Sequence, residues 1–325
     1  MRVKPFRIVG AAWALLLLFA CVAVLSNRFP LTWWASLSEH FRYHGIVLLL
    51  VIGGIALARK RFKIAGVFGL LILIMSPLTR MNVPDLSSMP GSADEVLVVA
   101  HANLGAEPDL NRLAVWLTEI DADVISLQEV RPGQLTVIDQ ALDGWHRRIA
   151  EARDDTRGVA IWSRPDRVPT SAEIIWPGDS IGADRPVARV QFEIDGESLE
   201  IVGESLEIVG VHFARPRNAA RFKTQQRELS DLLDHDRNQR ANAIVWIGDF
   251  NATPWSSLIW QAYDLASLAR VPAQSLWPAT YLDGPLLKLG LPIDFALARG
   301  ISDAQYAVGP SIGSDHRPIA VTVSP

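Results

Sequence analysis

Polar residues stand at the ends of several apolar segments in the C-terminal two thirds of the sequence. The segments are short and rich in Val, Ile and Ala, as in 96–100 and 243–247, which is typical of buried strands. The polar residues concerned are Asn103, Glu129, His212, Asp249, Asn251, Asp294, Asp315 and His316. Strand ends at one edge of a sheet bring distant residues into one cleft. Oxygen ligands there suit a hard cation such as Mg²⁺, and histidines can bind phosphate oxygens or transfer protons.

The elements that must position these residues alternate in type from Glu95 onward. Strands are expected at 96–100, 124–127, 158–162, 187–194, 206–213, 243–247, 293–298 and 318–323. Helices are expected after Pro108, at 134–142 and at 218–233, where apolar residues recur at helical spacing. Alternation mixed with hairpins predicts two sheets covered by helices rather than one parallel sheet.

The same polar residues form an ordered set of motifs, N, LQE, GVH, GDFN, ID and SDH, over about residues 95–325. This set resembles the endonuclease/exonuclease/phosphatase superfamily, which has the DNase I-like fold. GDFN followed by SDHRP is the most specific part of the resemblance. The resemblance implies an α/β fold, a four-layer αββα sandwich with a metal at the edge of the sheets.

The resemblance also implies a metal site. Glu129 matches the main Mg²⁺ ligand, with Mn²⁺ as the alternative cation. Asn103 would assist through the metal shell or a phosphate oxygen, and Asp315 would support the metal or its water. The absence of a thiol among these residues agrees with a hard cation.

Five further residues receive catalytic roles from the resemblance. Asp249 matches the carboxylate that orients or deprotonates the attacking water. Asn251 would donate to a phosphate oxygen as charge develops. His316, steered by Asp294, would contact the scissile phosphate. His212 matches a second histidine that contacts phosphate or transfers a proton.

Two positions depart from the pattern of relatives. Gly105 stands where some nuclease members carry a second acid, which weakens the match to DNA-repair members. Phe295 stands where many membrane-anchored relatives have His, although Asp294 is retained. Other polar residues are expected to be structural or exposed, namely His101, His146 and His235. Arg157 and Arg185 could contact phosphate, but ordinary surface positions are favoured for both.

Three apolar segments precede the polar motifs. Residues Ile8 to Ser26, Gly45 to Ala58 and Ile64 to Leu78 predict three transmembrane helices, with the basic stretch 59–63 as a cytoplasmic loop. The lipid bilayer is then an expected partner. The positive-inside rule places the C-terminal domain on the periplasmic or extracellular side of the bacterial inner membrane.

These patterns divide the chain into a membrane anchor (1–81), a linker rich in Pro, Ser and Gly (82–92) and a catalytic domain (93–325). Residues 1–90 carry ten Lys/Arg and two acids, a net charge of +8, whereas the remainder carries 21 and 33, a net charge of −12. An acidic domain disfavours tight, non-specific binding of nucleic acid but is compatible with a nuclease whose metal reverses the local field.

The leading prediction is hydrolysis of a phosphodiester or phosphomonoester. The substrate is either nucleic acid or a lipid or small phosphoester. The alternative is a catalytically silent membrane scaffold that keeps the fold for partner binding. A tandem repeat, ESLEIVG at 197–203 and 204–210, receives no function, and one copy is expected in a longer hairpin or loop.

Overall fold

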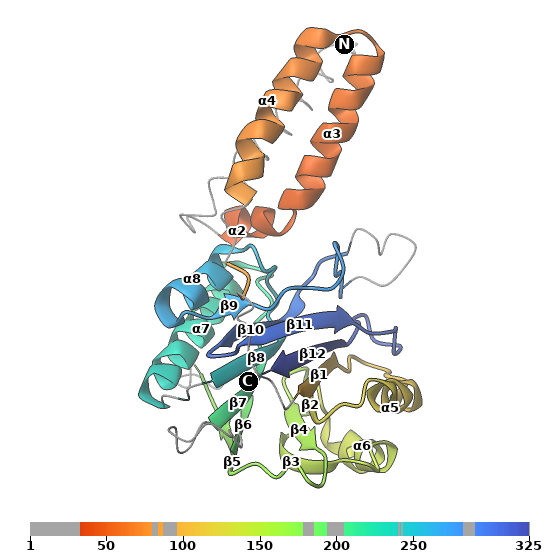
Figure 1. The fold of residues 1–325 in the computed structure, drawn as a ribbon, viewed down its shortest axis with the longest axis vertical. Coiled ribbons are helices and arrows are strands. Elements are labelled where there is room, and N and C mark those ends of the chain that lie inside the picture. The colour runs from red at the N-terminus through yellow and green to blue at the C-terminus, as the bar shows by residue number, and fades with distance from the viewer. Residues whose placement is uncertain are drawn as a thin grey trace.

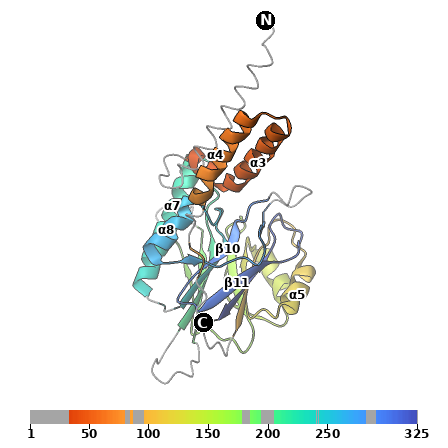
Figure 2. The ribbon, with the colours of Figure 1, turned by 45° about the horizontal axis from the view of Figure 1, so that its top comes forward.

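The computed structural model describes residues 33–79, 84–86, 96–177, 185–193, 205–239, 241, 243–281 and 290–324. Its main body is a sandwich of two six-stranded sheets with helices on both outer faces (Figure 1). A pair of helices projects from one end of this body (Figure 2).

The first sheet combines one parallel pair with antiparallel neighbours. Its strands, in spatial order, are β11 (Asp303–Val308), β12 (Ile319–Ser324), β1 (Leu97–Asn103), β2 (Val124–Gln128), β4 (Val159–Ser163) and β3 (His146–Glu151). Only β1 and β2 are parallel within it. The two central strands therefore end at the same edge.

The second sheet repeats this plan. Its strands, in spatial order, are β5 (Ser171–Ile175), β6 (Val187–Glu193), β7 (Ser205–His212), β8 (Ala243–Asp249), β10 (Asp294–Arg299) and β9 (Ala269–Arg270). Here β7 and β8 form the parallel pair, with His212 opposite Asp249. The second ESLEIVG copy lies in β7 from Ser205 onward, whereas the first copy lies outside the described residues.

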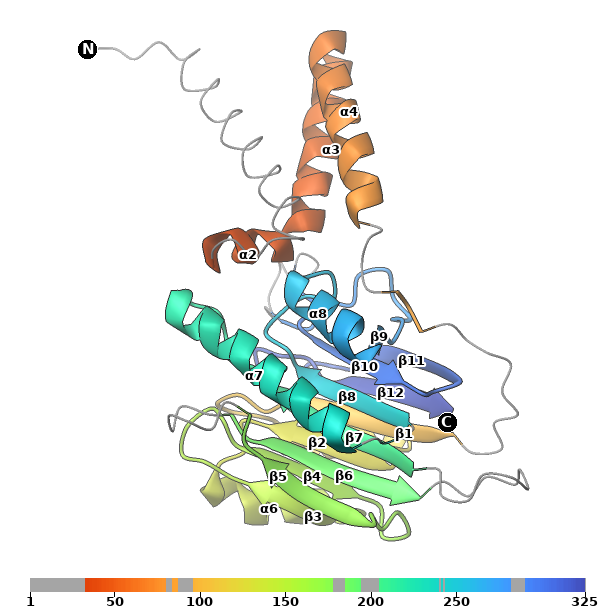
Figure 3. The same cartoon turned by 90° about the vertical axis from the view of Figure 1, so that its left-hand side faces the viewer.

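Apolar side chains fill the space between the sheets and the space under the helices. The inner faces of both sheets share one buried cluster, which α7 (Ala219–Gln239) and α8 (Ser257–Ala266) extend outward from the second sheet. A second cluster joins α5 (Leu110–Glu119) and α6 (Leu135–Ala141) to the first sheet. Figure 3 shows α7 and α8 along the second sheet and α6 beside the first. A short 3₁₀ turn at Pro132–Gln134 leads into α6.

The N-terminal part contains α2 (Trp33–His40), α3 (Arg42–Ala58) and α4 (Phe62–Thr79). The last two pack as a hairpin around Leu49 and Phe68, and many of their other large apolar side chains are exposed. The expectation of three transmembrane helices is not upheld. No helix among the described residues is both long and apolar enough to cross a membrane.

The predicted first span, from Ile8 to Ser26, lies outside the described residues. The predicted localisation was a multi-pass protein of the inner membrane with a periplasmic catalytic domain. It depended on the three spans and is therefore not upheld either. Part of the predicted linker also pairs with the sandwich. Leu86 donates its backbone N–H to Arg270 O at 2.8 Å, and Asp85 accepts from Arg270 Nε at 2.6 Å.

Candidate active site

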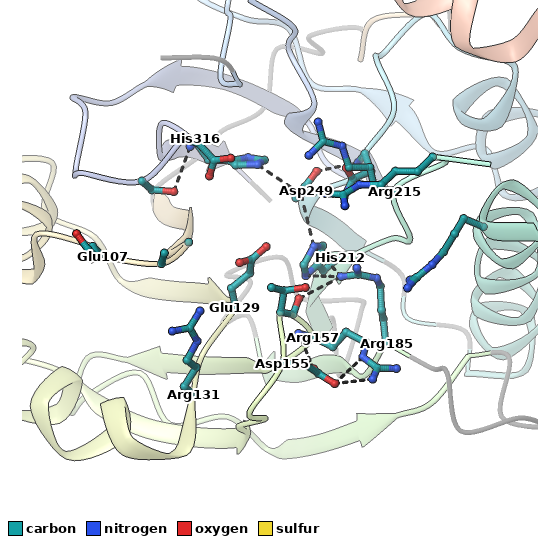
Figure 4. Close-up of a pocket in the computed structure, with 18 of the residues that line it drawn as sticks. Glu107, Glu129, Arg131, Asp155, Arg157, Arg185, His212, Arg215, Asp249 and His316 are labelled. Carbon is teal, nitrogen blue, oxygen red and sulfur yellow. Dashed lines mark hydrogen bonds and ion pairs between the residues drawn. The ribbon is translucent and has the colours of Figure 1, made fainter. Parts of the chain in front are cut away.

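The carboxyl ends of the two parallel pairs meet at one edge of the sandwich. Asn103 lies opposite Gln128 in the first sheet, and His212 lies opposite Asp249 in the second. Gln128 joins the sheets, because its side chain donates to Val211 O and accepts from Asp249 N. A cavity of about 1100 Å³ opens at this edge (Figure 4). Its lining includes Glu129, His212, Asp249, Asn251, Asp315 and His316.

Asp294 and His316 form a buried pair, with His316 on the cavity wall and Asp294 behind it. His316 Nδ1 lies 2.8 Å from Asp294 Oδ2, and His101 Nε2 lies 3.2 Å from Asp294 Oδ1. Burial opposes ionisation of both partners, but their mutual attraction outweighs it. The pKa of His316 is raised to about 10 by Asp294 and Asp249, and the pKa of Asp294 is lowered by His316 and His101. His316 is therefore a cation at the cavity.

Asp249 ends β8 with 1% of its surface exposed. Burial, and then the charge of Asp294, raises its pKa to about 7, although His316 acts in the opposite direction. Asn251 holds this carboxylate through its backbone N–H at 2.8 Å and its Nδ2 at 2.9 Å. The same Nδ2 donates to Phe213 O at 3.0 Å. In this arrangement the Asn251 amide braces Asp249.

Glu129 directly follows β2 and has a left-handed backbone, with φ +59°. Asn251 has φ +46°, and such conformations in residues other than glycine concentrate at functional sites. Asn103 Nδ2 lies 3.4 Å from both Glu129 Oε1 and Asp249 Oδ2, so it links the two carboxylates. Burial raises the pKa of Glu129. Asp315 is exposed on the same cavity wall.

The donor set fits a divalent cation. Asp249, Asp294 and His316 each offer one ligand atom, and these atoms lie within 4.8 Å of one another. Asp294, however, is fully buried and already accepts from two histidines. Glu129 and Asp315 present carboxylates on the cavity side of Asp249. Oxygen donors of this kind suit Mg²⁺ or Mn²⁺.

Two residues that the sequence analysis set aside belong to this site. His101 is fully buried and shares Asp294 with His316. Its signal was the period of two in β1, which places it on the same face as Asn103. Arg185 is 7% exposed, and its Nη1 lies 2.8 Å from His212 Nε2. It precedes β6 with no local pattern that could have revealed this contact.

Arg185 and burial together keep His212 neutral. Desolvation first, and then the Arg185 charge, lower the pKa of His212 well below its usual range. His212 Nε2 also lies 3.5 Å from Asp249 Oδ2. Arg185 Nη1 also lies 3.0 Å from His212 Nδ1, so a neutral ring that accepts from Arg185 at Nδ1 can direct its Nε2–H towards Asp249.

Both departures from the motif pattern have structural reasons. Gly105 has φ +61°, and a Cβ there would lie 2.9 Å from Ser314 Oγ, so a side chain would be strained and crowded. Phe295 is buried and stacks on Phe250 with ring centroids 4.3 Å apart. The position after Asp294 is therefore part of the core.

The sequence profile described as "Endonuclease/Exonuclease/phosphatase family" matches residues 100–316. The chain belongs to this family. Its matched region contains every residue discussed for the site and excludes the N-terminal helices. A search of curated proteins finds no match.

Solved structures share the DNase I-like fold at low sequence identity. An endonuclease/exonuclease/phosphatase from Bacteroides vulgatus is 15% identical, with a TM-score of 0.55 over 71% of this chain and 99% of that one. A family protein from Leptotrichia buccalis C-1013-b is 17% identical, with a TM-score of 0.55 over 70% and 99%. Truncated TDP2 of Caenorhabditis elegans is 14% identical, with a TM-score of 0.53 over 71% and 98%.

Proposed function

We propose that this family member hydrolyses a phosphate ester by attack of water, with Mg²⁺ or Mn²⁺ as cofactor. One observation carries the proposal. A buried carboxylate that titrates near neutrality, Asp249, meets the cationic His316 and the carboxylate of Glu129 at one cavity. A base, an electrophilic group and a cation ligand are what this reaction requires.

Some of these residues would contact the attacking water or the phosphate, and others would hold those side chains in position. Asp249 orients the attacking water and accepts its proton, for which a pKa near 7 is well matched. His316 stabilises negative charge on the phosphoryl oxygens, and Asp294 holds its ring through Nδ1. Asn251 and His212 keep Asp249 in place, and the phosphate contacts predicted for these two remain proposals.

Glu129, with Asn103 and Asp315 beside it, is the proposed position of the cation. When bound, Mg²⁺ or Mn²⁺ would polarise the phosphoryl group and stabilise the leaving oxygen. Asn103 links Glu129 to Asp249, which couples the cation ligand to the base without a further residue. We propose residues 93–325 as the catalytic domain.

The proposed substrate is a nucleic acid or a small or lipid phosphoester. The alternative of a catalytically silent scaffold is disfavoured by the site itself. Burying Asp249, Asp294 and His316 together costs free energy, and a fold that served only for binding would not require that cost.

The test is turnover by the full chain. Bis(p-nitrophenyl) phosphate, p-nitrophenyl phosphate, DNA, RNA and phospholipid are each assayed with Mg²⁺, with Mn²⁺ and in excess EDTA. Metal-dependent hydrolysis that Asp249→Asn removes supports the proposal, and Asp303→Asn, at an exposed strand position, is the matched control. Absence of hydrolysis for every substrate by a folded protein would favour the scaffold.

A further inference from the structure

Arginines gather on the cavity although the C-terminal part of the chain is acidic. Six of them line it, namely Arg131, Arg157, Arg185, Arg215, Arg217 and Arg221. Figure 4 shows Arg131, Arg157 and Arg185 across the cavity from His316. Five carboxylates line the same cavity, namely Glu107, Glu129, Asp155, Asp249 and Asp315, so the question is which arginines they leave unpaired.

These arginines differ in how they are paired. Arg157 bonds Asp155 at 2.5 and 2.8 Å, and Arg215 lies over the Tyr281 ring at 4.7 Å. Arg217 and Arg221 are exposed, and neither side chain has a hydrogen bond or ion pair with any residue that the structure describes. Together with the half-buried Arg131, they are the lining arginines whose guanidinium groups have no such partner among the described residues.

Arg185 makes the deeper wall of this region. It is 7% exposed, and its Nε is buried without a hydrogen-bond partner among the described residues. Burial lowers its pKa, the carboxylates of Glu228, Asp249 and Glu129 act in the opposite direction, and the charge of Arg221 lowers it again to a lesser degree. A bound anion would offset the repulsion between Arg185 and Arg221 and could accept from the unpaired Arg185 Nε–H.

The start of α7 adds positive potential at the same place. Asn218 lines the cavity and caps the helix, because its Oδ1 accepts from Arg221 N at 2.9 Å. The N-terminus of a 21-residue helix favours anions, and here Arg217 and Arg221 flank it. Helix terminus and free arginines therefore favour the same charge.

The cavity also has room for more than one phosphate. Its volume of about 1100 Å³ is slightly above the range of roughly 300–1,000 Å³ found for small-ligand sites. Guanidinium groups bind phosphate through paired N–H donors, which makes phosphate the anion they fit best.

We propose that Arg217, Arg221 and Arg185 bind a second phosphate group of the substrate. The preferred substrate is then a phosphoester that carries a further phosphate, as in an oligonucleotide or a small bisphosphate. The inference rests on the proposed function for the reaction and adds a recognition site to it.

The experiment compares substrates that differ by one phosphate. Thymidine 5′-(p-nitrophenyl phosphate) is assayed with and without a 3′-phosphate, and inositol bisphosphate is compared with inositol monophosphate. The full chain should prefer the additional phosphate by about tenfold or more in kcat/KM, as expected for charge-assisted hydrogen bonds. The double variant Arg217→Ala/Arg221→Ala should lose most of that ratio, and Arg→Lys at both positions should restore part of it.

Arg227→Ala is the matched control, since Arg227 is exposed on the same helix but does not line the cavity. It should keep the wild-type ratio. A preference confined to the nucleotide pair would assign the second phosphate to a nucleic-acid backbone, and one confined to the inositol pair would assign it to a small molecule. No preference in the wild type, or an unchanged ratio in the double variant, would overturn the inference.

Binding without metal separates this inference from the proposed function. In EDTA, thymidine 3′,5′-bisphosphate should bind about tenfold tighter than thymidine 5′-monophosphate by calorimetry, and the double variant should lose the difference. If no substrate is hydrolysed, the proposed function fails, and this binding ratio alone decides the second phosphate site. Equal affinities in the wild type would overturn it even in an active enzyme.

Discussion

Two buried clusters of acid and histidine flank the same stretch of chain, residues 249–257. The candidate active-site cluster combines Asp249 and His316 with their neighbours at the cavity. The second, which we call the α2 cluster, consists of Glu39 and His40 against Thr253 and Ser257. Both contain groups with shifted pKa values, but the cavity described above is lined by residues of the first cluster and by none of the second.

The α2 cluster is closed by hydrogen bonds. Ser257 donates its N–H to Glu39 Oε2 at 2.5 Å and its hydroxyl to Oε1 at 3.0 Å, and Thr253 N donates to His40 Nδ1 at 3.2 Å. Trp255 Nε1 donates to Glu39 O at 2.9 Å. Glu39 thereby lies at the N-terminus of α8, where a carboxylate is favourable. Burial and shifted pKa values alone therefore do not mark a catalytic site.

Removing the proposed cation ligand should have the largest effect. Glu129→Ala should abolish turnover that depends on Mg²⁺ or Mn²⁺ while the protein stays folded, because Glu129 is only partly buried beside the cavity. The measurement is the rate as a function of metal concentration, with circular dichroism as the folding control. Full wild-type activity in excess EDTA would contradict the assignment.

Changing the base and the cation at the cavity should have the next largest effect. Asp249→Asn and His316→Ala should each lower kcat by about 10²–10³, as expected when one preorganised group is lost. Because both act on one transition state, the double variant should be little slower than the slower single variant. Near-normal rates in the single variants would place the site elsewhere and favour the scaffold.

The α2 cluster should affect stability and its pH dependence more than catalysis. Burial raises the pKa of Glu39 to about 7, so its contribution to stability is present below about pH 4.5 and is lost as the pH rises through 7. Burial and Arg42 lower the pKa of His40 to about 4, so its contribution is present above about pH 6.5 and is lost as the pH falls through 4. In the wild type the two contributions therefore change the free energy of unfolding in opposite directions as the pH rises.

Single variants should show separately how Glu39 and His40 change the free energy of unfolding with pH. Relative to wild type, Glu39→Gln should gain stability as the pH rises from 4.5 to 7, and His40→Asn should lose it over a similar range. Each change is limited to roughly 1.4 kcal/mol per pH unit, the value for one proton. Thermal unfolding from pH 4.5 to 7.5 measures the stability of each variant relative to the wild type. If neither stability difference changed with pH, the opposite titration effects of Glu39 and His40 would be refuted.

The sequence specified the central strands better than the rim of the sheets. Strands β1, β2, β7 and β8 are almost wholly buried. Their apolar runs and the polar residues that end them could therefore be recognised in the sequence. The missed strands β3, β5, β9 and β11 all lie at sheet edges. Edge strands are half exposed and carry polar residues such as those of β3, which weakens their pattern.

Most site residues could be predicted because they follow these buried central strands. The site residues that were missed have a different explanation. Glu129, Asp249 and His316 belong to motifs with local signatures, whereas Arg185 reaches His212 only through the tertiary fold. The N-terminal helices show the opposite error. The apolar runs and the basic stretch 59–63 between two of them predicted membrane spans, but no helix among the described residues is long and apolar enough to cross a membrane. The short helix α2, which docks beside GDFN, was not among the predicted elements.

The smallest effect is expected from shortening the connection before β7. Strands β6 and β7 pair from Ala188↔Gly210 to Glu193↔Ser205, and the first repeat copy lies within the connection 194–204. Deleting residues 197–203 leaves Ile194, Asp195, Gly196 and Glu204 between the strands. Asp-Gly is a favoured hairpin turn, and four-residue loops are common in hairpins.

The pairing that sets the register of His212 lies wholly outside this deletion. Seven pairs join β7 to β8, from Leu206↔Ala243 to His212↔Asp249, so the cavity end of β7 should stay in place. We expect kcat to change by less than about twofold and the free energy of unfolding by less than about 0.5 kcal/mol, as for changes away from packed features. Because the two heptapeptides are identical, deletion of either copy gives the same protein sequence. One deletion variant therefore decides the question, and its loss of folding would show that the first copy also pairs in the sheet.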